Sequence, residues 1–268
     1  VETAMANDQF SILVDALSKA DLASTLEGAG PFTVFAPTNT AFQSLLSDLG
    51  ASSLDDLTVD QLISILLYHV KDARVMSEDL SNGYITTLST GPNDALTTML
   101  VETDGGVTLN GSTSVTAADI EALNGVIHQV DKVLMPPNVV DIAVNNSNFS
   151  TLVEAVQKAE LVTTLSGDGP FTVFAPSNEA FDALFEDLGV GGIADLSKSD
   201  LTPILQYHVV SGNVRSGDLS SGTVTTLNGD ITLDVGDQVL INSRATVTAA
   251  DIQGTNGVVH AIDSVLVP

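Results

Sequence analysis

One nine-residue stretch occurs twice in this sequence. Residues 30–38 read GPFTVFAPT and residues 169–177 read GPFTVFAPS, so the two copies lie 139 positions apart. A repeat of this length is a whole domain rather than one unit of a solenoid. The chain is therefore predicted to form two domains. We place them at residues 1–136 and 137–268, because the dipeptide Pro-Pro at 136–137 closes the first repeat.

Each copy of this stretch predicts a turn, a strand and the start of a helix. The Gly-Pro pair favours a turn, and residues 32–35 alternate at the period of a buried strand. Pro37 ends that strand. Thr38 then occupies the place of a helix N-cap, as Ser177 does in the second copy.

The remainder of each repeat predicts helices first and strands afterwards. In the first repeat, apolar residues fall at helical spacing over 8–29, 39–49 and 57–70. Short β-rich runs follow, and the Asn-Gly pair at 110–111 suits a tight hairpin. The second repeat is seven residues shorter in its β-rich part, which we assign to the loop near 89–95. This order predicts an α+β fold, a wedge or sandwich of short strands with helices packed along it.

The charge of the chain excludes one class of partner and disfavours another. Acidic residues number 34 against 8 basic ones, and the formal net charge is −26. Binding to nucleic acid requires Lys and Arg to neutralise phosphates, so we expect no nucleic-acid partner. Attraction to anionic lipid is disfavoured for the same reason.

Other features of the composition narrow the possibilities further. No apolar run reaches the roughly 18–20 residues that a membrane span needs, so we expect no membrane insertion. Cysteine is absent, which excludes disulfides, thiolate catalysis and Cys-ligated zinc. The first ten residues have no basic segment followed by an apolar one, so we expect no signal peptide among them.

Three motifs, each present in both repeats and in the same order, resemble a known family. They are TVFAPTNTAF (33–42) with TVFAPSNEAF (172–181), LLYHV (66–70) with LQYHV (205–209), and NGVIHQVDKVL (124–134) with NGVVHAIDSVL (256–266). With these motifs the sequence resembles two tandem fasciclin-like domains, of the fasciclin I family. The resemblance implies a β-wedge of seven to nine strands with helices, displayed outside the cell and used in adhesion.

The resemblance also implies candidate binding residues. In animal relatives a Tyr-His pair and an Asp-Ile motif are proposed to take part in integrin binding. The matching positions are Tyr68, His69, Asp119, Ile120, Tyr207, His208, Asp251 and Ile252. The contexts AADIE and AADIQ differ from the animal motifs on their N-terminal side, and the sequence contains no RGD.

The residue pattern itself favours a second interpretation of the histidines. His69, His128, His208 and His260 each lie on an otherwise apolar face of a predicted helix or strand. That position is typical of a core histidine that hydrogen-bonds the backbone of a neighbouring loop. Under this interpretation the Tyr-His pairs connect a helix end to the β-rich part of the domain.

Motifs that would indicate catalysis or specific metal binding are absent. We find no nucleophile elbow, no phosphate-binding loop, no HExxH and no EF-hand loop. We therefore expect no enzymatic activity, no cofactor and no specific metal site. The many carboxylates predict at most weak, non-specific binding of divalent cations.

These observations lead to one main hypothesis and two alternatives. The main hypothesis is a non-enzymatic adhesion protein at an extracellular, periplasmic or cell-surface location. Its partner would be a cell-surface or matrix protein, a glycan, or a second copy of itself. The first alternative is an exported module that binds a hydrophobic or carbohydrate ligand in a groove between strands. A hydrolase is the second alternative and has the least support, because no nucleophile is evident.

Overall fold

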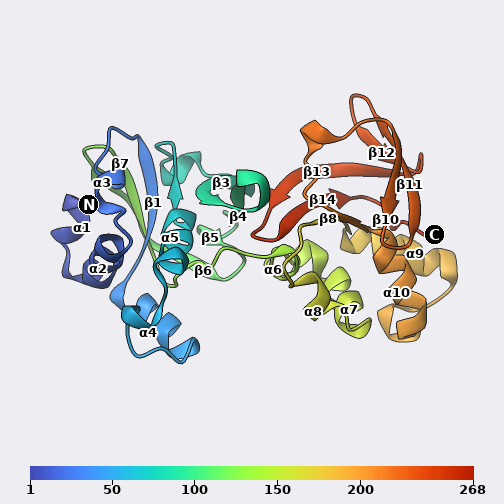
Figure 1. Ribbon diagram of the computed structural model, residues 1–268, viewed down its shortest axis with the longest axis horizontal. Coiled ribbons are helices and arrows are strands. Elements are labelled where there is room, and N and C mark those ends of the chain that lie inside the picture. Colours follow the sequence, from blue (N-terminus) through green and yellow to red (C-terminus); the bar gives the residue numbers. More distant parts are fainter. The chain divides into compact units, whose positions relative to one another are not determined.

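The computed structural model describes residues 1–268 and separates into two compact units (Figure 1). One unit comprises Val1–Thr90 and Leu96–Pro136, and the other comprises Gly91–Ala95 and Pro137–Pro268. We call them the first and the second domain. Each contains a seven-stranded sheet together with helices, which confirms the predicted α+β class.

The first domain begins with helices and ends with strands. The helices are α1 (Glu2–Met5), α2 (Ser11–Lys19), α3 (Ala23–Leu26), α4 (Asn39–Asp48) and α5 (Val59–Tyr68). The strands are β1 (Phe32–Pro37), β2 (Val70–Lys71), β3 (Gly83–Thr90), β4 (Leu96–Glu102), β5 (Thr108–Leu109), β6 (Thr113–Ala122) and β7 (Gly125–Val130).

The second domain repeats this order of elements. Its helices are α6 (Val139–Val144), α7 (Ser150–Lys158), α8 (Val162–Leu165), α9 (Asn178–Leu188) and α10 (Lys198–Tyr207). Its strands are β8 (Phe171–Pro176), β9 (Val209–Ser211), β10 (Gly222–Thr226), β11 (Gly229–Val235), β12 (Val239–Ile241), β13 (Ala245–Gln253) and β14 (Gly257–Ile262).

The first strand of each domain pairs with the last one. The sheet orders are β2-β1-β7-β6-β5-β4-β3 and β10-β11-β12-β13-β14-β8-β9. The pairs β1–β7 and β8–β14 are parallel, whereas every other pair is antiparallel. In β6 the pairing to β7 shifts register between Ala117 and Ile120, which marks a β-bulge.

The repeated nine-residue stretch links the sheet to the helices, as predicted. Strand β1 lies between β2 and β7 and ends at Pro37. The Thr38 hydroxyl then caps α4 by accepting from the Ala41 amide at 3.3 Å. The next side chain, Asn39, accepts a hydrogen bond from the Ile12 amide at 2.9 Å and so joins α4 to α2.

The Asn-Gly pair before the last strand fits the start of β1. The Asn124 side chain donates hydrogen bonds to the carbonyls of Leu26 and Gly28, both at 2.8 Å. Gly125 pairs directly with Phe32, and a Cβ atom at this glycine would lie 2.0 Å from the Phe32 carbonyl oxygen. Only glycine allows the two strands to approach this closely.

The first domain has two apolar clusters. One contains residues of α2, α4 and α5 with β1 and β7, and it includes Phe10, Phe42 and Leu62. The other surrounds Tyr68 at the end of α5 and is built from β-strand residues such as Met99 and Leu109. Figure 1 shows α2, α4 and α5 around β1 in this domain. Helix α5 therefore contributes to both clusters.

Two sequence predictions concern the length of a loop and the length of a helix. The extra residues of the first repeat lie where expected, because β3 and β4 are joined through Gly91–Ala95 whereas β10 and β11 are joined by residues 227–228. Helix α5 is shorter than the helix predicted over residues 57–70. It begins after the Thr58 N-cap and ends at Tyr68, since Val70 pairs with Val34 in the sheet.

Candidate functional site

The histidine of each Tyr-His pair is buried at the C-terminal end of a helix. His69 and His208 are the C-cap residues of α5 and α10. Their Nε2 atoms accept hydrogen bonds from the amides of Leu134 and Leu266, each at 2.9 Å. Each histidine thus connects a helix end to the chain that follows the last strand of its domain.

The hydrogen bonds define the tautomer and protonation state of these two rings. Because Nε2 accepts from an amide, the proton resides on Nδ1, which donates to the Ile65 or Ile204 carbonyl at 2.8 Å. Burial disfavours the charged imidazolium and lowers the pKa of His69 and His208 to about 4. Both rings are therefore neutral at pH 7, with neither nitrogen available to a partner.

The tyrosine of each pair is also held inside the domain. The Tyr68 hydroxyl donates to the Thr98 carbonyl and accepts from the Asn110 side chain, both at 2.9 Å. Burial raises the pKa of this hydroxyl above its usual range. Tyr207 makes the equivalent bonds to the Asp230 carbonyl at 2.8 Å and from Asn242 at 3.0 Å.

The aspartate of each Asp-Ile pair lies in a polar cluster at the β-bulge. Asp119 has a left-handed backbone conformation, with φ of 60°. Its carboxylate accepts from the Ser77 amide at 2.8 Å and from the Ser77 hydroxyl at 2.5 Å. These bonds hold the pKa of Asp119 below its ordinary value. His128 completes the cluster, since its Nδ1 accepts from the Asp119 amide at 3.2 Å.

The second domain repeats this cluster with Ser216, Asp251 and His260. The Asp251 carboxylate accepts from the Ser216 amide at 2.7 Å and from its hydroxyl at 2.6 Å. Burial raises the pKa of Asp251, but the Ser216 hydrogen bonds and the nearby Arg215 outweigh burial and keep that pKa below its ordinary value. We call both sets the Ser-Asp-His clusters.

The Ser-Asp-His clusters are not arranged as catalytic triads. In a triad the serine hydroxyl is hydrogen-bonded to the histidine that removes its proton. Here the Ser77 hydroxyl donates to Asp119 instead. The His128 ring is buried, with Nδ1 accepting from a backbone amide and Nε2 donating to the Val75 carbonyl at 2.9 Å. The geometry fixes the loop around Val75 to the sheet and provides no activated nucleophile.

The candidate binding residues differ sharply in exposure. The Tyr-His pairs are buried in both domains, and Ile252 is buried as well. Ile120 is partly buried against the apolar cluster that includes Phe10, Phe42 and Leu62. The Asp119 side chain is 34% exposed and that of Asp251 is 25% exposed. Both carboxylates are therefore within reach of a partner.

Sequence reasoning missed the serines that bind these carboxylates. Ser77 and Ser216 occupy equivalent positions of the two repeats, within SEDL (77–80) and SGDL (216–219). Alignment of the repeats would have shown the shared Ser-x-Asp-Leu pattern. Their contact with an aspartate 35–42 residues later is visible only in the fold.

Two further properties of the structure bear on function. No group of three or more His, Asp or Glu side chains is placed so that it could hold a metal ion. No helix has the length and apolar character required to cross a membrane.

The fold and these motifs define a tandem pair of domains of one family. A family model described as "Fasciclin domain" matches residues 8–136 and 147–268, so the chain belongs to the fasciclin domain family. A solved FAS1 domain pair from the insect cell adhesion molecule fasciclin I has a similar fold. Its TM-score is 0.52 at 20% identity, with 100% of this chain and 95% of that chain covered.

Curated relatives come from animals and from a cyanobacterium. The chain is 34% identical over 257 residues to transforming growth factor-beta-induced protein ig-h3 of Sus scrofa, covering 91% of this chain and 35% of the relative. It is 32% identical over 253 residues to periostin of Homo sapiens, covering 92% and 29%. It is 44% identical over 131 residues to protein sll1483 of Synechocystis sp., covering 48% and 73%. The chain thus spans about a third of the length of the two animal relatives.

Proposed function

We propose that this protein is a non-enzymatic adhesion module that works outside the cytoplasm, in an extracellular, periplasmic or cell-surface location. The observation that carries the proposal is the likeness of the whole chain to a domain pair from a cell adhesion molecule. Its partner would be a matrix or cell-surface protein, a glycan, or a second copy of the chain. The large negative charge suits a role without nucleic acid.

We propose that each domain has its own contact surface, around its Ser-Asp-His cluster. Asp119 and Asp251 present partly exposed carboxylates on a rigid support, because serine hydrogen bonds and the β-bulge hold each of them in place. The buried Tyr-His pairs and Ile252 would act by maintaining that support. Ile120 would contribute its partly exposed edge.

The arrangement of the histidines supports the absence of enzymatic activity in this proposal. All four are buried with their ring nitrogens hydrogen-bonded to backbone atoms. A general base must be within reach of the proton that it removes. The ring nitrogens of these histidines are already paired with the backbone, so none of them is available to remove a proton from a substrate.

An attachment assay tests the proposal. Cells, or beads carrying matrix proteins, would be applied to surfaces coated with the full chain. Albumin would serve as the reference coating. Beads coated with the chain itself would test self-association, and each measurement would be made with and without divalent cations. We expect saturable attachment above the albumin level. Attachment indistinguishable from albumin for every partner, including the chain itself, would refute adhesion.

The alternative of a small-ligand module rests on a different observation, a cavity of the second domain. This alternative does not depend on adhesion.

A further inference from the structure

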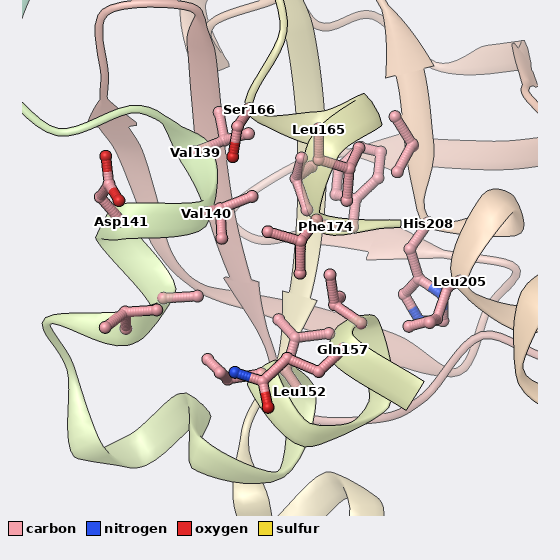
Figure 2. A pocket seen from close by; sticks show the side chains of 17 residues that line it. Val139, Val140, Asp141, Leu152, Gln157, Leu165, Ser166, Phe174, Leu205 and His208 are labelled. Atoms are coloured by element: carbon pink, nitrogen blue, oxygen red, sulfur yellow. The ribbon is translucent and has the colours of Figure 1, made fainter. Parts of the chain in front are cut away.

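The second domain contains a cavity that is much smaller in the first. A space of about 220 Å³ lies among α6, α7, α8, β8 and the end of α10 (Figure 2). In the first domain the space bordered by the equivalent residues Leu13, Leu17, Leu26 and Val34 measures about 40 Å³. One of these positions has a smaller side chain in the second domain, where Val156 replaces Leu17. The two domains therefore differ in their capacity to hold a ligand.

The wall of this cavity is apolar and uncharged. Figure 2 shows Val140, Leu165 and Phe174, which come from three different segments, around one space. The titratable side chain deep in the wall is His208, whose ring is neutral at pH 7 and already hydrogen-bonded at both nitrogens. The interior thus favours hydrocarbon and has no charge with which to bind an ion.

Apart from His208, the polar side chains of the cavity lie at its margin. They are Asp141, Gln157 and Ser166, all of which are exposed. The Asp141 carboxylate and the net charge of −26 both oppose an anionic headgroup. The Gln157 amide and the Ser166 hydroxyl can donate to or accept from an uncharged polar group.

The volume limits the size of the ligand. A cavity of about 150 Å³ holds benzene, whereas pockets for drug-sized ligands begin at about 300 Å³. The observed 220 Å³ lies between these values. At the packing density of protein interiors, about 0.74, this space takes roughly 160 Å³ of ligand atoms. It therefore accommodates one hydrocarbon chain of about eight to ten carbons and excludes diacyl lipids.

We propose that the second domain binds an uncharged amphiphile with one such hydrocarbon chain. The chain occupies the space between Val140, Val156 and Phe174, and the uncharged head group lies at the margin near Gln157 or Ser166. Val144, which is 58% exposed, lines the cavity and leaves it accessible from solvent. The site goes beyond the adhesion role, and either proposal stands if the other fails.

Methyl NMR of the full chain during titration with 1-decanol tests this site. We expect saturable shifts of methyl groups that line the cavity, such as those of Val140, Val156 and Leu165. Decanoate at pH 7.5 should bind at least tenfold more weakly, because its carboxylate meets the negative margin. No saturation up to the solubility limit of decanol, or shifts confined to methyls outside the cavity, would overturn the proposal. Equal affinity for decanoate would overturn the preference for an uncharged head.

Two substitutions make the test specific. Val156→Phe fills the cavity and should weaken decanol binding at least tenfold. Val267→Phe makes the same change at a position that is 52% exposed and outside the cavity, and it should bind like the wild type. If Val156→Phe does not fold, Val156→Leu installs the residue found at the equivalent position of the first domain and should lower the affinity at least threefold. Unchanged affinity in a folded position-156 variant would refute the site.

Discussion

Replacement of His69 by phenylalanine should cost stability at neutral pH and cost almost nothing in acid. Phenylalanine keeps a ring at this buried position but has no proton to gain and no nitrogen to pair. The Leu134 amide and the Ile65 carbonyl lose the hydrogen bonds that His69 makes with them. One buried unpaired group costs about 1–3 kcal/mol, so His69→Phe should lower the unfolding free energy by about 3 kcal/mol at pH 7.5.

The sign of the pH dependence follows from the lowered pKa. Burial lowers the pKa of His69 from 6.5 to about 4, so the unfolded chain takes up a proton at a higher pH than the folded domain does. The contribution of His69 to stability is therefore full above pH 6.5 and falls by about 1.4 kcal/mol per pH unit between pH 6.5 and 4. The variant lacks the contribution of His69 but keeps that of His208, which is common to both proteins. The difference between the two proteins should shrink by about 2–3 kcal/mol between pH 7.5 and 4.5.

Urea unfolding of both proteins, followed by far-UV circular dichroism at several pH values, measures this difference. The comparison cancels the titration of the many carboxylates, which is common to wild type and variant. Leu62→Ala serves as a control, because it removes buried apolar volume within the same helix, α5, and should cost the same at every pH. A His69→Phe difference that stays constant or grows as the pH falls would refute a neutral, buried His69.

Three further outcomes are expected. Asn124→Ala removes the hydrogen bonds to the Leu26 and Gly28 carbonyls and should lower the unfolding free energy by about 2 kcal/mol. Asn148→Ala, at an exposed position, should change it little in the same urea titration, and equal effects would contradict the role of Asn124. Ser77→Ala removes the hydroxyl that helps to lower the pKa of Asp119, so it should lower the unfolding free energy by about 1 kcal/mol at pH 7. This loss should become smaller as the pH falls below 3.8, where Asp119 becomes protonated in the unfolded chain. A loss of stability that grows in acid would contradict the role of Ser77. Raising NaCl from about 10 mM to about 0.5 M should raise the melting temperature, because salt screens the repulsion within a chain of net charge −26. A fall in melting temperature would show that this repulsion does not limit the stability of the protein.

Local features of the fold could be predicted because they depend on neighbouring residues. The strand at 32–37, the Thr38 cap and the capping box of Thr58 with Gln61 all follow from residue type and spacing within a few positions. The site of the seven-residue difference was also predictable, because a loop tolerates a length change at low cost. The C-terminal boundary of α5 was harder to predict, because the helix ends where Val70 pairs with Val34 in the sheet.

Features that depend on distant residues could not be predicted in the same way. Nothing local to Phe32 shows that its strand runs parallel to the last strand of the domain, against Gly125. The contact of Ser77 with Asp119 needs both the β-bulge and the loop to be in place. The cavity of the second domain depends on how far its helices stand from β8, and one smaller side chain at Val156 is only a weak sign of it.

The likeness between repeats was the most useful guide to the candidate site. It showed that His69 and His208 share one environment, and the structure places both at a helix end with the same hydrogen bonds. It did not separate residues that would support the proposed contact surface from residues that would form it. That distinction comes from burial, which leaves Asp119 and Asp251 partly exposed and the Tyr-His pairs inside.

Attachment by two double variants tests most directly the proposal that exposed aspartates, and not the Tyr-His pairs, make the adhesive contact. The double variant Asp119→Asn/Asp251→Asn keeps an oxygen that can accept a hydrogen bond from each serine but removes both charges. Asp237→Asn is the control, because the Asp237 side chain is exposed and makes no hydrogen bond. His69→Gln/His208→Gln alters only the buried pair. At a temperature where circular dichroism shows all proteins folded, we predict that the aspartate variant loses attachment and the histidine variant retains it. If the folded histidine variant lost attachment and the aspartate variant kept it in full, the proposed role of Asp119 and Asp251 would be contradicted.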